Sequence, residues 1–203
     1  MDINLQVPDL NGLSNISSYY VMHRFFRGVG PATYAEYALV VNFIRLVDLS
    51  ILEYQSGRKL LFEFWNTHEG TAVGAINLSS GYFEACISNT KRSLNYLKSI
   101  RSYESSPKEI KNLLPRSLHV LKSVTEKKIT KLRHAIQHLE KQIQLGFITE
   151  GQAVYLKPGQ NCLELGGASI LYTELASWLT ELHECSSKLF EYFSEKKVNE
   201  KVT

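Results

Sequence analysis

The chain has 203 residues, of which 44% are hydrophobic and 21% are charged, and its formal net charge is +3. This composition excludes a disordered chain, and the length suits one domain with a sizeable hydrophobic core. A membrane span is not expected, because the most apolar stretch, residues 37–54, contains Asn42, Arg45 and Asp48.

The N-terminal part of the chain predicts an irregular segment followed by a long helix. Residues 1–30 lack a clear period, and the aromatic side chains within them predict that this segment packs on a helical bundle. Pro31 is typical of a first helical turn, and the apolar helix that follows is expected to end at Tyr54 or Gln55. Residues 58–65, RKLLFEFW, fit either a continuation of this helix or a short strand.

Two further long helices are predicted from apolar residues that recur at helical spacing. The first is expected to run from Thr71 or Asn77 to Arg101, and the second from Ser117 to Leu145. A short helical turn is expected between them.

The chain is predicted to end with a β-hairpin and a fourth long helix. Residues 153–165 alternate in the manner of short strands, and Pro158-Gly159 suits the centre of a tight turn between them. Apolar spacing then predicts a helix from Tyr172 to Lys196.

Together these elements predict an all-α fold. It is an up-down bundle of four long helices, with extra short helices and a small β-hairpin inserted before the last helix. The helical domain is expected to span residues 31–196, with residues 1–30 packed on it and residues 197–203 as a frayed tail.

The sequence favours a cytoplasmic location. Cys86, Cys162 and Cys185 are widely spaced, odd in number and without metal-ligand spacing, which is typical of reduced thiols. The N-terminal residues also lack the basic region and apolar core of a secretory signal.

Positive charge is concentrated between residues 91 and 141, which hold 13 Lys or Arg and 4 Asp or Glu. This segment carries +9, so the rest of the chain carries −6, because the whole chain carries +3. A segment with this excess attracts polyanions.

One stretch of this basic segment, KLRHAIQHLEKQI (residues 131–143), combines cationic and imidazole side chains. With Leu132 at the centre of the buried stripe, a rotation of about 100° per residue sets the direction of each side chain. This places five polar side chains on the face away from the core: Arg133, His134, Gln137, His138 and Lys141. Because His134 and His138 are four residues apart, they are expected to touch.

The run RHAIQH, residues 133–138, resembles the signature of HEPN domains, which is an arginine, a polar residue and a histidine after a short spacer. The order of the predicted elements is similar too, with the signature in the penultimate long helix and a final helix that closes the bundle. The resemblance covers residues 31 to 195, and the six-residue signature is its functionally specific part.

The resemblance implies a metal-independent endoribonuclease without a cofactor, which cleaves RNA by attack of the 2′-hydroxyl in a prokaryotic toxin–antitoxin or antiviral defence system. His138 would transfer a proton, Arg133 would hold the phosphate, and His134 would orient the substrate. RNA would also contact the neighbouring polar side chains, which are Lys127, Lys128, Lys131, Gln137 and Lys141.

The resemblance also implies a homodimer, and helix geometry gives a reason for one. Arg133 and His138 lie about 140° apart around an ideal helix, so one isolated helix hardly directs both at one phosphate. Two such faces across a two-fold axis would supply two arginines and two histidines to one cleft. A nucleotidyltransferase-like antitoxin is a further expected partner.

Other interpretations stay open at this stage. The basic face is also typical of a solvated helix, of a non-catalytic HEPN-like module that binds RNA, nucleotide or a partner protein, or of a scaffold for an acidic protein. The two histidines have a spacing that zinc sites use, but no third ligand is evident. Glu36, Asp48 and Glu84 are candidates for an assisting acid, and nothing in the sequence singles one out.

Overall fold

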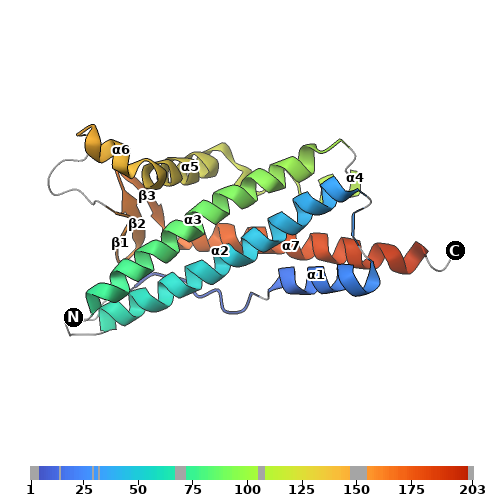
Figure 1. Ribbon diagram of the computed structural model, residues 1–203, viewed down its shortest axis with the longest axis horizontal. Helices are drawn as coiled ribbons and strands as arrows, with labels where there is room; N and C mark the ends of the chain where they lie inside the picture. The colour runs from blue at the N-terminus through green and yellow to red at the C-terminus, as the bar shows by residue number, and fades with distance from the viewer. Residues whose placement is uncertain are drawn as a thin grey trace.

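The computed structural model describes residues 5–13, 15–28, 30–31, 33–66, 72–104, 108–146 and 155–200 (Figure 1). Its elements in chain order are α1 (Ile16–Arg27), α2 (Tyr34–Asn66), α3 (Ala72–Ser102), α4 (Lys108–Leu113), the 3-10 helix η1 (His119–Leu121), α5 (Ser123–Gln137), α6 (Leu139–Gln144), β1 (Lys157–Pro158), β2 (Cys162–Leu165), β3 (Ala168–Leu171) and α7 (Tyr172–Glu200). The predicted mainly helical fold with a small β element is confirmed.

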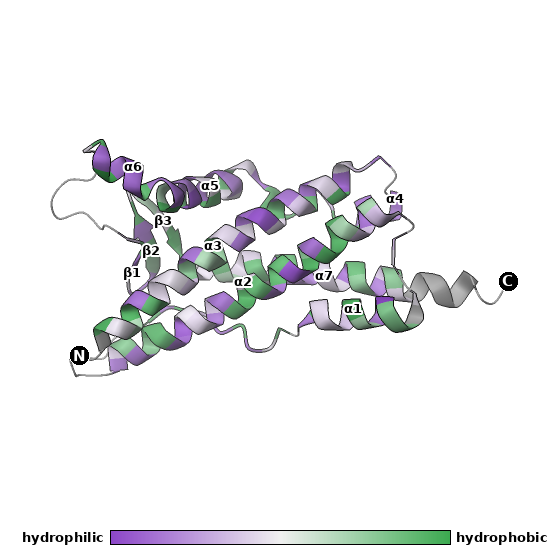
Figure 2. Ribbon diagram, in the orientation of Figure 1, coloured by the Kyte–Doolittle hydropathy of each residue, from purple (hydrophilic) through white to green (hydrophobic). Residues whose placement is uncertain are grey.

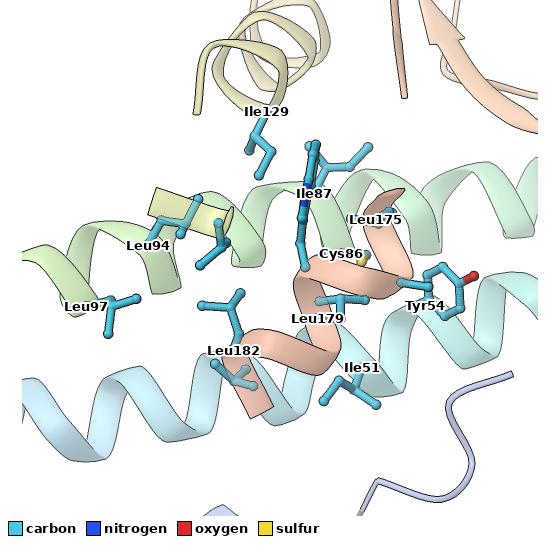
Figure 3. Packing of buried hydrophobic residues seen from close by; sticks show 14 of the residues in the cluster. Ile51, Tyr54, Cys86, Ile87, Leu94, Leu97, Ile129, Leu175, Leu179 and Leu182 are labelled. Atoms are coloured by element: carbon cyan, nitrogen blue, oxygen red, sulfur yellow. The ribbon is translucent and has the colours of Figure 1, made fainter. Parts of the chain in front are cut away.

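Two long helices, α2 and α3, lie side by side and form the centre of the molecule, and α7 packs against α2 (Figure 1). Buried side chains from these helices and from α5 meet in one core (Figure 3). Figure 2 shows that α5 and α6 carry many hydrophilic residues above this core. Among the described residues, no helix is both long enough and apolar enough to cross a membrane.

The ambiguous stretch RKLLFEFW is helical, and α2 therefore continues to Asn66. Leu61 is fully buried there, and Phe62 and Trp65 pack against the core. A close contact between α2 and α3 precedes this stretch. The position of a Cβ on Gly57 would be 3.1 Å from the ring of Phe83, so the missing side chain allows the close approach.

The sequence predicted that residues 1–30 are irregular, but they contain the helix α1. Asn15 caps this helix by accepting a hydrogen bond from the Ser18 amide, and Gly28 ends it with φ at +60°. Asparagine before a helix and glycine after it are ordinary helix-end signals, so the sequence did carry evidence for α1.

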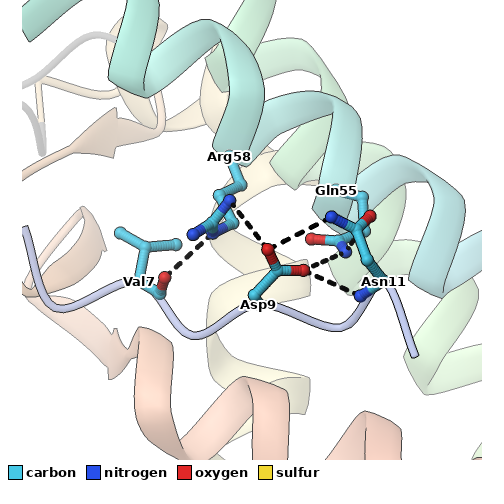
Figure 4. Close-up of polar contacts among 5 residues, drawn as sticks. All are labelled: Val7, Asp9, Asn11, Gln55 and Arg58. Carbon is cyan, nitrogen blue, oxygen red and sulfur yellow. Dashed lines mark hydrogen bonds and ion pairs between the residues drawn. The ribbon is translucent and has the colours of Figure 1, made fainter. Parts of the chain in front are cut away.

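Polar contacts hold the first described residues along α2 (Figure 4). Arg58 donates from its Nε to the Val7 carbonyl oxygen at 3.0 Å and lies 3.5 Å from a carboxylate oxygen of Asp9. Gln55 donates to both Asp9 and Asn11. Hydrogen bonds, chiefly from Gln55, lower the pKa of Asp9 below its ordinary value. This segment is therefore tied to the second half of α2 by side-chain contacts.

The buried Asp48 of α2 connects α1 to the core, because its Oδ2 accepts a hydrogen bond from the Ser17 amide at 2.6 Å. We expect Asp48→Ala to lower the free energy of unfolding by about 1 kcal/mol, since a first-turn amide loses its acceptor. Hydrogen exchange should accelerate in α1 and remain unchanged in α3. Arg45→Ala, an exposed change on the same helix, is the control, and equal protection of α1 in both variants would contradict the prediction.

The β element is larger than the predicted hairpin, because β1, β2 and β3 form an antiparallel sheet in that order. The first turn is also displaced from its predicted centre. Pro158 pairs with Leu163, and Gly159 donates to the Cys162 carbonyl oxygen, so residues 160–161 form the tip. Gly166 and Gly167 form the second turn with φ at +55° and +69°, which two-residue hairpin turns favour.

The predicted third long helix is wrong as a single element. The chain forms η1, α5 and α6 in its place, and His138 separates the last two helices with φ at −113° and ψ at 16°. Val124 of α5 and Ile143 of α6 are 66% and 48% exposed, so these two apolar side chains do not face the core. The fourth long helix begins at the predicted Tyr172 and extends to Glu200 instead of ending at Lys196.

Candidate functional site

The basic helix α5 is positioned by its apolar face. Ile129, Leu132 and Ala135 are buried, and α5 contacts both α3 and the strands β2 and β3. Because these residues face the core, His134 and the lysines on the opposite side of α5 are exposed. Leu132 is therefore buried and His134 and Gln137 are exposed, as predicted, whereas Arg133 is only partly exposed.

The two histidines are neighbours on the surface. The ring centroids of His134 and His138 lie 4.7 Å apart, with 38° between the ring planes. Both residues are exposed. His138 still donates its amide to the His134 carbonyl oxygen at 3.0 Å, although α5 ends at the preceding residue. The bend after α5 thus leaves the predicted contact between the imidazoles in place.

Arg133 differs from the histidines because it is only partly exposed. Its Nε is buried and has no hydrogen-bond partner within the described part of the chain. A buried guanidinium nitrogen without an acceptor is unfavourable unless another group satisfies it. The single chain therefore brings the two histidines together, and Arg133 does not line the groove that His134 lines.

An open groove of about 780 Å³ lies beside this face, between α5, α3, α6 and the β2–β3 turn. It is lined by Lys91, Ser123, Glu126, Lys127, Thr130, Lys131, His134, Ala135, Gln142 and Gly166. Three lysines and one glutamate make its lining positive in sum. Lys131 also donates to the Gly167 carbonyl oxygen at 3.1 Å, which connects α5 to the second turn of the sheet.

The groove's carboxylate is held between two lysines. Glu126 lies 2.9 Å from the Nζ of Lys91 and also contacts Lys98. Hydrogen bonds from Lys98 and Lys91 lower the pKa of Glu126 from 4.5 to about 2. Since the folded state lowers this pKa, the ion pairs of Glu126 with the two lysines stabilise the protein above about pH 4.5. This stabilisation is lost as the pH falls through 2, where Glu126 becomes protonated in the folded state.

Glu126→Gln is expected to have opposite effects on stability and on polyanion binding. The free energy of unfolding at neutral pH should fall by about 1 kcal/mol, because the buried Lys91 loses the negative charge of Glu126. The effect is modest because the ion pair between them is partly exposed to solvent. Affinity for a polyanion should rise several-fold, since the groove loses a negative charge. Thermal unfolding and heparin titration measure the two effects, and weaker heparin binding would contradict the expected charge of the groove.

The remaining predicted residues take different positions. Lys127 and Lys131 line the groove, whereas Lys128 forms an ion pair with Glu174 of α7 at 2.6 Å. Gln137 and Lys141 are exposed and do not line the groove. The sequence reasoning missed Lys91, which comes from α3 and is nearly buried.

The three candidate acids have structural contacts. Asp48 binds the Ser17 amide, as described above, and Glu84 accepts a hydrogen bond from the Leu156 amide at 3.3 Å. Burial raises the pKa of Glu84 above its ordinary value. Glu36 is buried near the start of α2. In the described part of the chain, no cluster of three or more His, Cys, Asp or Glu residues is suited to hold a metal ion.

Comparison with known proteins gives no relative for this chain. No protein-family model, curated protein or solved structure matches it.

Proposed function

We propose that the protein is a metal-independent HEPN-type endoribonuclease that acts on RNA at the face of α5. The observation that carries the proposal is the exposed pair of imidazoles, His134 and His138, next to a groove lined by lysines. Cleavage of RNA in the presence of EDTA, by the wild type and by His138→Ala, tests it.

The proposed reaction needs only proton transfer and charge stabilisation. The 2′-oxygen of a ribose forms a bond to the adjacent phosphorus, and the bond from phosphorus to the 5′-oxygen breaks. His138 takes the proton of the 2′-hydroxyl while water protonates the departing 5′-oxygen, or it gives a proton to that oxygen while water takes the 2′ proton, because histidine exchanges protons near neutral pH. His134 orients the substrate beside it. The products are a 2′,3′-cyclic phosphate and a 5′-hydroxyl.

The proposal includes a homodimer, because Arg133, the first residue of the signature, does not line the groove that His134 lines. Arg133 is partly buried, whereas both histidines are exposed. A second copy facing the first would bring its own arginine to the phosphate, where a planar guanidinium stabilises the charge of the transition state.

The four helices of the proposed up-down bundle are α2, α3, α5 and α7.

The biological setting of the proposal is a prokaryotic toxin–antitoxin or antiviral system in the cytoplasm. An unrestrained ribonuclease is harmful to the cell that makes it, so a nucleotidyltransferase-like antitoxin is the proposed control partner. Expression of the wild type should stop the growth of the bacterial host. Co-expression of an antitoxin encoded by a neighbouring gene should restore growth.

A non-catalytic RNA-binding module is the second candidate, and the position of Arg133 favours it. If the chain acts as a single copy, the groove still attracts RNA, but Arg133 does not line it beside His134. This candidate requires salt-sensitive RNA binding that survives His138→Ala, without cleavage by the wild type.

A further inference from the structure

A second basic pocket of about 400 Å³ lies near the end of α3. It is lined by Lys98, Arg101, Ser102, Arg116 and Leu121. Three of its five residues are cationic, and none is a carboxylate. Arg101 and Arg116 come from opposite sides of the short helix α4 in the sequence, so the fold has brought them together.

Among the described residues that line this pocket, no carboxylate balances the two guanidinium groups. Burial and the nearby charge of Arg116 both lower the pKa of Arg101 below its ordinary value. The Nε of Arg101 is buried and has no hydrogen-bond partner among the residues that the structure describes. Two like charges with an unsatisfied donor are unfavourable, and an anion between them removes both costs.

This pocket adjoins the groove beside His134. Lys91 lines the groove and Lys98 lines the pocket, and both contact Glu126. They are seven residues apart and therefore project from the same side of α3. Glu126 precedes His134 by eight residues, which corresponds to about 12 Å along α5. One extended polyanion can therefore reach both places.

We infer that Arg101 and Arg116 form a phosphate-binding subsite that holds the backbone of an RNA strand several nucleotides away from the histidines. The inference rests on the proposed function in taking RNA as the polyanion. Each guanidinium offers a planar set of donors that matches phosphate oxygens. Lys98 adds a positive charge at the rim, although Glu126 already binds it.

The test measures binding of 2′-O-methylated RNA, which has no free 2′-hydroxyl, so cleavage does not interfere. The probes are a dinucleotide and a single strand of about twelve nucleotides, a length within the range that single-strand sites cover. Arg116→Gln should weaken binding of the longer strand several-fold and leave the dinucleotide unaffected. The salt dependence of the longer strand should also become shallower, by about 0.7 in the slope of log K against log salt.

The controls separate this subsite from general charge and from misfolding. Arg92→Gln removes a guanidinium from another side of α3, where Arg92 is exposed and bonds only Asn89 in the described contacts, and it should bind like the wild type. Arg101→Lys keeps the charge of the partly buried residue and should lose less affinity than Arg101→Gln. Unchanged binding by Arg116→Gln, with thermal unfolding as in the wild type, would overturn the inference.

These measurements distinguish a failure of the phosphate-binding subsite from a failure of the proposed ribonuclease activity. A protein that does not cleave RNA, but loses affinity for the longer strand in Arg116→Gln, supports the subsite and rejects catalysis. A protein that cleaves RNA, with a longer strand bound equally by Arg116→Gln and Arg92→Gln, supports catalysis and rejects the subsite.

Discussion

His138→Ala is expected to lower the rate of RNA cleavage by about 10²–10⁴-fold, the usual contribution of a general acid or base. The wild type should cleave equally well with and without EDTA, because the proposed reaction uses only side chains. Gel analysis of a labelled RNA measures the rate. The product should carry a 2′,3′-cyclic phosphate, which acid opens to a mixture of 2′- and 3′-phosphates.

Two control variants make this result specific. His138→Gln keeps a polar side chain of similar length at the bend and should be as inactive as the alanine variant, because an amide does not transfer protons. His119→Ala removes an exposed imidazole from η1, away from the groove, and should cleave like the wild type. Full activity in both His138 variants would exclude this residue from catalysis.

Mixed dimers of two inactive variants are expected to recover activity. Arg133→Ala should lower cleavage by about 10²–10³-fold, as loss of a donor to the transition state does. If two copies form one cleft, a heterodimer of Arg133→Ala and His138→Ala keeps one arginine and one histidine at that cleft. Its activity should exceed that of either homodimer by at least about tenfold, since each lost group has an intact counterpart.

Co-expression with two different affinity tags, followed by sequential purification, isolates the heterodimer. Light scattering gives its mass, and thermal unfolding shows whether removal of the partly buried Arg133 disturbs the fold. A heterodimer as inactive as its parents would reject the shared cleft. A wild-type protein that stays monomeric at micromolar concentration would reject the dimer itself.

The long helices were predictable because their apolar residues repeat with the helical period. The start of α7 at Tyr172 and the helical pattern of α3 were both evident from this spacing. The bend at His138 was not, because the residues around it keep a helical pattern and contain neither proline nor glycine. The difference arises from tertiary contacts: α5 packs on α3 and the sheet, and α6 has no buried residue.

The candidate site was predictable only where it depends on one helix. The exposed histidines and Lys131 follow from the direction of α5 alone. The role of Lys91 requires knowledge of which side of α3 faces α5, and a single sequence does not give it. The ion pair of Lys128 with Glu174 likewise depends on how α7 packs beside α5.

The bend at His138 connects two helices that differ in how many of their residues are buried. α5 is fixed by four buried residues, whereas α6 has none, so α6 should detach at a much lower free energy than α5. The His138 ring lies at this joint, 4.7 Å from the His134 ring, because His138 ends α5 and precedes α6. Under the proposed mechanism, a molecule that rests on α6 would change the alignment of the two rings, and with it the rate of proton transfer, without touching either ring.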